Sequence, residues 1–301
     1  MSLSVRRVLC AVDLSECSGR ALSAAATFAR RYEAHLSVVH VRPKTGPLVT
    51  AGPFMDQRFG SFSGSSDRMQ LAVSLRDFVT LETGIAQPDA VVEEASDVSA
   101  AILARAAQEQ TDLIVLGTHR RHAMPRFMLG SVAEKVLRRA GCAVLMVPAT
   151  VSRNAPSSLG RILCALDFAG GGMVALRYAC DLAEAAAGQL TMLHVIELPP
   201  AGPHMREADL ASYRAARFEY ARECMKASLS EVRGRCDVHE LLFVGTPERE
   251  IVRVASEQES DLIVMGIHGR TAADIALFGS VTHHVVRHAP CLVLTVRGEE
   301  T

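Results

Sequence analysis

The sequence has no excess of charge of either sign and no long apolar run. Lys and Arg together number 32 against 33 Asp and Glu in a chain of 301 residues, so no net field draws the protein to nucleic acid or anionic lipid. Apolar stretches such as residues 113–116 and 262–265 are far shorter than the roughly 18 residues of a membrane span. No apolar signal segment follows Arg6 and Arg7. We therefore expect a cytoplasmic protein that binds neither nucleic acid nor membrane.

Several catalytic and cofactor motifs are also missing. The sequence has no lysine-bearing P-loop and no Gly-x-Gly-x-x-Gly after its first predicted strand, which excludes an ordinary P-loop or Rossmann site. None of the eight cysteines has CxxC spacing, so a redox role has no support from the sequence. No residue pair stands out as a dedicated base and nucleophile, so the sequence does not demand an enzyme.

What the sequence does contain is an internal repeat. The stretch TDLIVLGTH at 111–119 returns as SDLIVMGIH at 260–268, an offset of 149, whereas Asp13 returns as Asp167, an offset of 154. A middle segment that changes length between fixed ones is typical of a surface loop on a repeated core. We predict two tandem domains, residues 1–152 and 153–301.

Each half alternates short apolar runs with helix-forming segments. Strands are predicted at 8–12, 36–41, 90–94, 113–116 and 143–147, and again at 162–166, 190–196, 238–243, 262–265 and 292–296. Helices are predicted at 21–31, 68–83, 98–109 and 131–140, then at 174–187, in a long charged segment reaching 226, and at 247–258 and 280–288. The order strand, helix, strand indicates parallel units with right-handed crossovers. The pattern predicts two open, doubly wound α/β domains.

A glycine pattern follows the fourth predicted strand of the second half. Gly266, Gly269 and Gly279 have the spacing Gly-x2-Gly-x9-Gly, and Ser280 begins the last predicted helix. A glycine at a strand end permits positive φ and close approach to a ligand, while N–H groups at a helix start suit a phosphate. Asp167 follows the first strand, beside the usual ligand crevice of such a sheet. The alternative is that the glycines only make tight loops and that Ser280 caps the helix.

This glycine pattern, together with Asp167, resembles the ATP-binding signature of the universal stress protein family. The resemblance covers nearly the whole chain as two tandem domains. The resemblance implies tandem Rossmann-like, adenine nucleotide alpha hydrolase-like domains, each with five parallel strands in the order 3-2-1-4-5. It also implies ATP, with Mg²⁺, as cofactor. The residues implied to surround the nucleotide are Ala165, Leu166, Asp167, Val195, Gly266, His268, Gly269, Arg270, Gly279, Ser280 and Val281.

The first half departs from this signature. Its equivalent residues are Asp13, Val41, Gly117, Gly130 and Ser131. However, Arg120 stands where the second half has Gly269. An arginine there strains a loop that needs positive φ or fills the pocket, or else its guanidinium binds phosphate. We therefore expect the nucleotide mainly in the second domain, although residues 169–172 there, AGGG, also depart from the turn at 15–19.

Histidines and cysteines form the remaining candidates. His283, His284 and His288 suggest a metal cluster, but on a helix only 284 and 288 share a face, so a solvated or interface surface is favoured. His40 and His194 suit structural roles at the second strand of each half. Four cysteines recur at equivalent places in or beside apolar strands, as expected of buried reduced thiols: Cys10 with Cys164, and Cys142 with Cys291.

Three functional hypotheses stay open. The leading one is an ATP-binding regulatory stress protein in which occupancy of the second domain sets conformation or partner choice. The second is an enzyme of weak ATP hydrolysis or nucleotidyl transfer, in which His268 and Arg270 stabilise phosphate charge. The third is a nucleotide-free protein-interaction module. The resemblance further implies that residues 143–147 pair with 292–296 in a built-in pseudo-dimer. We also expect a homo-oligomer, such as a dimer of chains, and a protein partner that the sequence does not identify.

Overall fold

The structure is a computed structural model that describes residues 5–44, 66–118, 129–151, 159–198, 207–267 and 279–298. The chain divides into two compact units, one of Ser4–Ser157 and one that holds Ser158–Thr301. Each unit is described by itself below, and the precise limits at 152 and 153 stay a prediction. In the part of the chain that the structure describes, no helix has the length and apolar character needed to cross a membrane.

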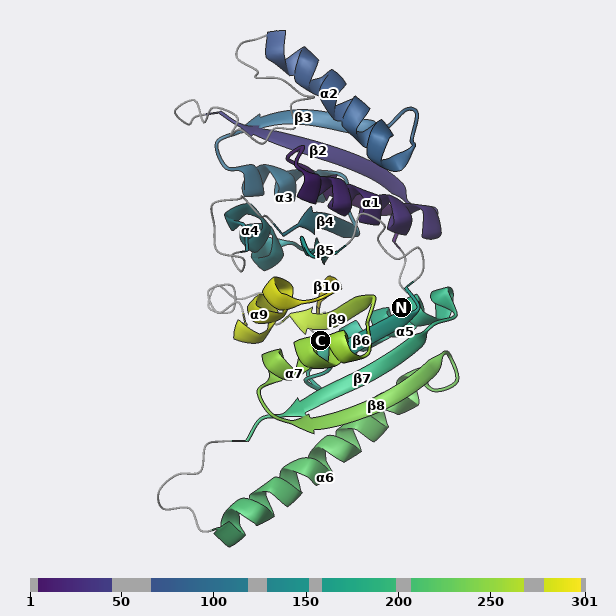
Figure 1. Cartoon of the computed structure of the whole chain (residues 1–301), viewed down its shortest axis with the longest axis vertical. Helices are drawn as coiled ribbons and strands as arrows, with labels where there is room; N and C mark the ends of the chain where they lie inside the picture. Colours follow the sequence, from purple (N-terminus) through teal and green to yellow (C-terminus); the bar gives the residue numbers. More distant parts are fainter. Residues whose placement is uncertain are drawn as a thin grey trace. The chain divides into compact units, whose positions relative to one another are not determined.

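The first unit is a five-stranded parallel sheet covered by helices (Figure 1). Its strands stand in the order β3-β2-β1-β4-β5. The elements, in chain order, are β1 (Arg7–Ala11), α1 (Glu16–Arg31), β2 (His35–Pro43), α2 (Ser66–Thr83), β3 (Asp89–Ala95), α3 (Val98–Gln108), β4 (Leu113–Gly117), α4 (Ser131–Arg139) and β5 (Ala143–Val147).

The second unit repeats this arrangement, with strands in the order β8-β7-β6-β9-β10. Both units therefore confirm the predicted α/β class and the strand order 3-2-1-4-5. The elements are β6 (Arg161–Ala165), α5 (Gly170–Ala186), β7 (Gln189–Ile196), α6 (Glu207–Val232), β8 (Asp237–Val244), α7 (Pro247–Glu257), β9 (Leu262–Ile267), α9 (Ser280–His288) and β10 (Leu292–Arg297).

The helices cover both faces of each sheet. In the first unit α1 packs beside α2, and α3 packs beside α4. Right-handed crossovers require this division, because the chain moves outward from β1 to β3 and then back across the sheet to β4 and β5. The pairs α5 with α6 and α7 with α9 repeat it in the second unit. The first helix and the last helix of each unit thus lie on opposite faces of its sheet.

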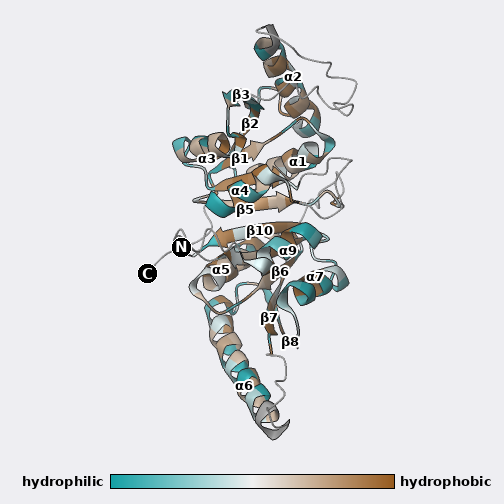
Figure 2. Cartoon of the chain, turned by 90° about the vertical axis from the view of Figure 1, so that its left-hand side faces the viewer, coloured by the Kyte–Doolittle hydropathy of each residue, from teal (hydrophilic) through white to brown (hydrophobic). Residues whose placement is uncertain are grey.

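The core is the apolar interior of the central strands, which Figure 2 colours predominantly hydrophobic. Every residue of β5 is buried, as are the first four of β4. Cys10 and Cys164 are fully buried at equivalent positions of β1 and β6, as expected for small apolar side chains, and all eight cysteines are free thiols. Strands buried on both faces need continuous rather than alternating apolar runs, which is why short runs such as 113–116 predicted them correctly.

Two helices begin earlier than predicted. The strong helix formers start near Ala21 and Val174, but α1 begins at Glu16 and α5 at Gly170. In α1 the reason is a cap, because the Ser15 side chain accepts a hydrogen bond from Ser18 N at 3.2 Å. In α5 the extra turn contains three glycines, whose low helix propensity hides it from a composition-based prediction.

Candidate functional site

The carboxyl edge of the sheet is organised by the register of three central strands. In the second unit Ala165, the last residue of β6, pairs with Leu193 of β7 and Met265 of β9. Asp167, Val195 and Gly266 follow these three residues within two positions. The sheet therefore brings them to one edge, at the switch point between β6 and β9 where ligands of doubly wound sheets bind.

A strained turn follows the first strand in both units. Phe168 has φ of 60° and Leu14 has φ of 61°, a left-handed conformation that costs a non-glycine residue about 1 kcal/mol or more. The preceding carboxylate closes each turn: Asp167 Oδ1 accepts a hydrogen bond from Ala169 N at 3.0 Å, and Asp13 Oδ1 accepts one from Ser15 N at 3.1 Å. The turn thus keeps an exposed carboxylate at the strand end in both units.

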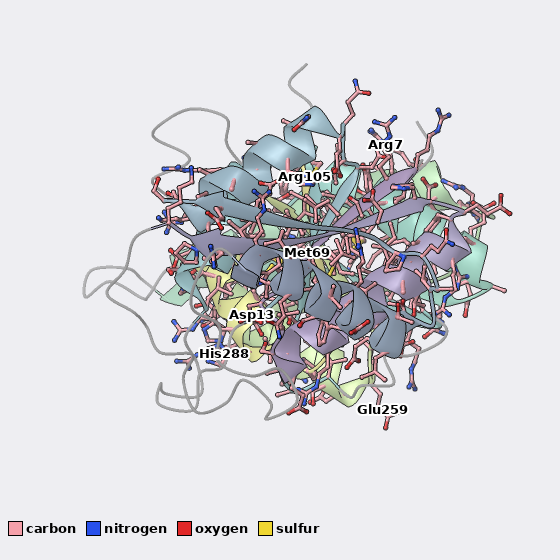
Figure 3. All side chains as sticks on the ribbon, turned by 90° about the horizontal axis from the view of Figure 1, so that it is seen from above. Arg7, Asp13, Met69, Arg105, Glu259 and His288 are labelled. Atoms are coloured by element: carbon pink, nitrogen blue, oxygen red, sulfur yellow. The ribbon has the colours of Figure 1, made fainter. Side chains whose placement is uncertain are left out.

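The position of this carboxylate can be followed in the first unit. Figure 3 labels Arg7, the first residue of β1, and Asp13, which comes two residues after its last. Asp13 lies at the carboxyl edge, and Arg7 opens the strand at the amino edge, where its backbone N–H donates to Asp112 Oδ2 at 2.9 Å. The amino edge is thus held by a contact between strand starts, and Asp13 belongs to the edge that the strand order marks for ligands.

A histidine of the second strand buttresses this turn. His194 Nδ1 lies 2.7 Å from Leu166 O, and His40 Nδ1 lies 2.9 Å from Val12 O in the first unit. Burial lowers the pKa of both imidazoles, so each is neutral near pH 7, and its Nδ1–H donates because the carbonyl can only accept. The Phe168 ring also lies against His194, with 4.2 Å between ring centroids. These contacts are the structural role expected of the two histidines.

Gly266 is required by packing. A Cβ at Gly266 would lie 2.3 Å from Gly171 C and 2.7 Å from Gly172 N, closer than real atoms approach. Among the described glycines only Gly84 and Gly234 have positive φ, so the expected positive φ at this strand end is wrong. The physical reason is that the first turn of α5 packs directly on the end of β9, where only a residue without Cβ fits.

Three further glycines of this contact were not predicted as site residues. Gly171 lies against Gly298, because a Cβ added at Gly298 would lie 2.9 Å from Gly171 N. A Cβ at Gly172 would lie 2.3 Å from Asp167 Oδ1. The run of three glycines at 170–172 is the sequence signal of this close contact, but by itself it shows only a departure from the first half.

The start of α9 differs from this packed contact. Gly279 is the N-cap residue with φ of −53°, and Ser280 and Val281 are the first two helical residues. The alternative in which Ser280 is the cap is therefore wrong. Gly279 and Ser280 are both exposed, and among the described atoms a Cβ at Gly279 would meet only Thr282 Oγ1, at 4.0 Å. Packing within the described residues explains Gly266 and leaves Gly279 unexplained.

The N-terminus of α9 lies at the same edge of the sheet as Asp167. The helix connects the parallel strands β9 and β10, so it runs against them and begins at their carboxyl ends. No side chain of the described residues caps it, and its first N–H groups carry the positive end of the helix dipole. This end of the helix is suited to an anion.

The first unit holds the equivalent predicted residues in the same elements. Val41 lies in β2, Gly117 ends β4, Gly130 is the N-cap of α4, and Ser131 is its first residue. The predicted residues Arg120, His268, Gly269 and Arg270 lie outside the described residues.

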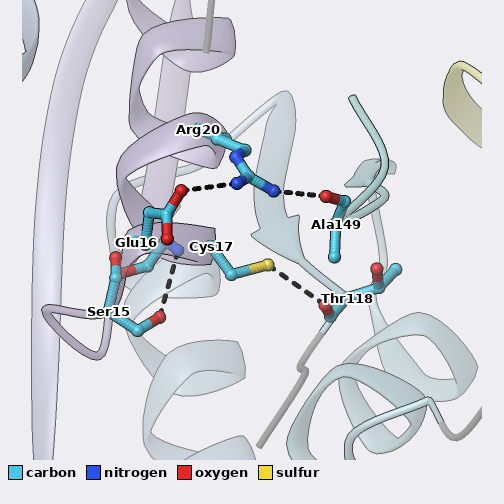
Figure 4. Close-up of polar contacts among 7 residues, drawn as sticks. Ser15, Glu16, Cys17, Arg20, Thr118 and Ala149 are labelled. Atoms are coloured by element: carbon cyan, nitrogen blue, oxygen red, sulfur yellow. Dashed lines mark hydrogen bonds and ion pairs between the residues drawn. The ribbon is translucent and has the colours of Figure 1, made fainter. Parts of the chain in front are cut away.

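In the first unit, side chains at the start of α1 contact the backbone just after β4 and β5, and most of the equivalent positions in the second unit are glycines (Figure 4). Cys17 Sγ donates to Thr118 O at 3.1 Å. The Arg20 guanidinium donates to Ala149 O and pairs with Glu16 Oε1 at 2.6 Å. The corresponding positions of the second unit carry Gly171 for Cys17, Val174 for Arg20, Gly170 for Glu16 and Gly298 for Ala149. We call the side-chain contacts of Cys17, Arg20 and Glu16 the latch.

The helix α9 carries the histidines considered for a metal. The rings of His284 and His288 stack with centroids 4.1 Å apart, which confirms that these two share a face. Burial, then the neighbouring His288, lowers the pKa of His284. Within the residues that the structure describes, no group of three or more His, Cys, Asp or Glu side chains is placed to hold a metal ion.

The sequence also matches a known family twice. The model of the universal stress protein family matches residues 4–148 and again 159–297. The chain belongs to the universal stress protein family. A universal stress protein of Methanocaldococcus jannaschii is 27% identical over 150 residues, which cover 49% of this chain and 88% of the relative. One of Thermus aquaticus is 32% identical over 142 residues, covering 47% and 98%.

The fold of this tandem universal stress protein is also found in a crystal structure. A universal stress protein from Archaeoglobus fulgidus matches it with a TM-score of 0.69 at 22% identity, covering 98% of this chain and 99% of that one. At this identity the likeness shows the fold alone. The double family match and the shared fold together confirm the tandem organisation indicated by the internal repeat.

Proposed function

We propose that this universal stress protein binds ATP, with Mg²⁺, in its second domain, and that occupancy regulates its conformation or its choice of partner. The observation that carries the proposal is Gly279. It stands exposed at the start of α9, and no described side chain caps that helix. The nearest described atom to a Cβ placed there is Thr282 Oγ1, at 4.0 Å. A glycine at a helix start that the described residues give no packing reason for fits close approach of a phosphate.

The residues of this edge fit the parts of an adenine nucleotide. The Asp167 carboxylate would accept hydrogen bonds from ribose hydroxyls, while the N–H groups at the start of α9 and the Ser280 hydroxyl would hold phosphate oxygens. Mg²⁺ binds oxygen ligands, including those of phosphates, and would offset their charge. The adenine would lie beside Val195 and the end of β6, at Ala165 and Leu166. By the family signature, His268, Gly269 and Arg270 would complete the phosphate side.

For the first domain we propose the role of a nucleotide-free partner. The latch supports this, because Cys17, Glu16 and Arg20 place side chains at the start of α1, where the second domain has Gly171, Gly170 and Val174. Ser15 also occupies one N–H of that helix start. The pairing of residues 143–147 with 292–296, a homo-oligomer and a cytoplasmic location stay predictions from the sequence.

ATP titration of a matched pair of variants tests the proposal. Gly279→Asp places a carboxylate where the phosphates would lie, and like-charge repulsion should weaken binding at least tenfold, about 1.4 kcal/mol. Gly130→Asp makes the same change at the start of α4 and should leave affinity unchanged. Calorimetric titration with ATP and Mg²⁺ measures both. Equal affinity of Gly279→Asp and the unaltered protein would overturn the proposal.

The same variants distinguish regulation from turnover. A binding protein should release phosphate from ATP at the background rate. Phosphate release by the unaltered protein that disappears in Gly279→Asp and persists in Gly130→Asp would instead favour the slow ATPase.

A further inference from the structure

Two cysteines far apart in the sequence meet in the second unit. Cys180 lies in the middle of α5, and Cys236 comes directly before β8, 56 positions later. Their Sγ atoms are 4.0 Å apart, and both are free thiols. The first unit has Ala26 in place of Cys180 at the offset of 154. The thiol pair is thus a property of the second unit rather than of the repeated fold.

Ion pairs hold the two segments together next to the thiols. Arg235, the neighbour of Cys236, donates from Nη2 to Asp181 Oδ1 at 2.6 Å and from Nε to Glu184 Oε2 at 3.0 Å. Asp181 is the neighbour of Cys180, and its side chain is only 10% exposed. Charge-assisted hydrogen bonds of this geometry are stronger than neutral ones. The backbone around both cysteines is therefore held in place while the thiols are reduced.

We propose that Cys180 and Cys236 are a modification site that forms a reversible disulfide, with a low-molecular-weight disulfide such as oxidised glutathione as the oxidant. A disulfide has an S–S length of about 2.05 Å, so the sulfurs must approach by roughly 2 Å. Side-chain rotation supplies displacements of this size without a change of fold.

The exchange takes two balanced steps. The Cys236 thiolate attacks one sulfur of oxidised glutathione, the glutathione S–S bond breaks, and one glutathione leaves as a thiolate that takes up a proton. The Cys180 thiolate then attacks the sulfur of Cys236 and releases the second glutathione. The protein loses two protons and two electrons, and one oxidised glutathione becomes two reduced ones.

Burial decides the order of these steps. Cys180 is fully buried, and burial raises the pKa of its thiol to about 12. Cys236 is half-buried; burial raises the pKa of its thiol as well, and the positive charge of Arg235 opposes this increase. The more accessible Cys236 meets the oxidant first, and Cys180 resolves the mixed disulfide. The reaction should be slow at neutral pH and faster at mildly alkaline pH, because the thiolate is the nucleophile.

The disulfide would link α5 to the start of β8 around β7 and α6. A cross-link over a span of this length restricts the unfolded chain strongly. The second unit should therefore unfold at a temperature higher by several degrees when oxidised. This inference does not depend on the proposed nucleotide site.

The test is oxidation of the full chain by oxidised glutathione at mildly alkaline pH, followed by thiol titration and peptide mapping. Titratable thiols under denaturing conditions should fall from eight to six, with a Cys180–Cys236 peptide that dithiothreitol removes. Cys180→Ser should instead stop at a mixed disulfide of glutathione with Cys236, and Cys236→Ser should form no cross-link. Cys224→Ser removes a half-buried cysteine of α6 and is the control: it should form the same cross-link, and its titratable thiols should fall from seven to five. All eight thiols remaining, or a cross-link between other cysteines, would overturn the proposal.

Discussion

The two domains bring the first helix against the end of the fourth strand in different ways. In the second domain a Cβ at Gly266 would lie 2.3 Å from the backbone of Gly171, whereas in the first a Cβ at Gly117 would lie 3.1 Å from Cys17 O. The helix therefore approaches the strand more closely where both residues are glycine. Where one is cysteine, the helix stands off and side chains span the gap.

This difference separates two roles of glycine that look the same in the sequence. Gly266 and Gly279 both belong to the glycine signature, but a Cβ added at Gly266 would clash with the backbone of α5, whereas one added at Gly279 would meet no described atom closer than 4.0 Å. The first is a packing residue and the second a candidate ligand contact. Substitutions at the two should therefore affect different properties of the protein.

The largest expected effect is on stability, at Gly266. Gly266→Ala forces the α5 backbone away from β9 and should lower the free energy of unfolding of the second domain by about 3 kcal/mol. Gly117→Ala meets Cys17 at 3.1 Å, including its rotatable thiol, and should cost the first domain about 1 kcal/mol. Chemical denaturation measures both. Equal losses would remove the contrast between the two contacts.

The next effect is a pH dependence that the two domains should share. Burial lowers the pKa of His40 and His194 in the folded state, so below about pH 6.5 the unfolded chain binds more protons than the folded one. Above that pH the two histidines take nothing from the free energy of unfolding. Below it the free energy of unfolding should fall by up to about 1.4 kcal/mol per pH unit for each histidine, until the folded imidazoles also protonate. Denaturation between about pH 8 and pH 5 measures this.

Variants of the two histidines assign this pH dependence. His40→Asn and His194→Asn keep a donor for the Val12 and Leu166 carbonyls but cannot titrate, so each should flatten the profile of its own domain. A profile that stays steep in both variants would show that other groups cause it.

A smaller effect is expected on ATP affinity, from a change beside Asp167 at the start of α5. Gly172→Ala places a Cβ 2.3 Å from Asp167 Oδ1, so the carboxylate must rotate away from its hydrogen bond with Ala169 N, which should also lower the stability of the second domain by about 1 kcal/mol. ATP binding should weaken about fivefold, about 1 kcal/mol. Gly170→Ala is the matched control, because nothing lies within 4 Å of a Cβ there among the described atoms. Titration should show a change only for Gly172→Ala, and equal affinities would exclude Asp167 as a ribose contact.

The smallest effect concerns the helix caps. Ser15→Ala removes the acceptor of Ser18 N and should destabilise the first domain by about 1 kcal/mol. Ala169→Ser supplies the missing cap to α5 and should stabilise the second domain by about 0.5 kcal/mol. Thermal unfolding measures the two shifts, which should have opposite signs. A loss of stability in Ala169→Ser would mean that the start of α5 has no room for the hydroxyl.

Much of the fold could be predicted from the sequence, because buried parallel strands and the repeat both leave strong patterns. The early start of α5 was missed, since glycines contribute little to helix prediction. The packing role of Gly266 could not be foreseen, because it depends on Gly171, which is remote in sequence. The meeting of Cys180 with Cys236 and the latch of Cys17 with Thr118 are likewise contacts between distant segments, and no spacing rule encodes them.

The most direct test of the account is the number of nucleotides bound per chain. The protein would be saturated with ATP and Mg²⁺, freed of unbound ligand and denatured, and the released nucleotide counted for the unaltered chain, Gly279→Asp and Gly130→Asp. The account predicts one nucleotide per chain, lost in Gly279→Asp and retained in Gly130→Asp. Two nucleotides per chain, or one that disappears in Gly130→Asp instead, would contradict the assignment of binding to the second domain, and none would contradict the nucleotide site itself.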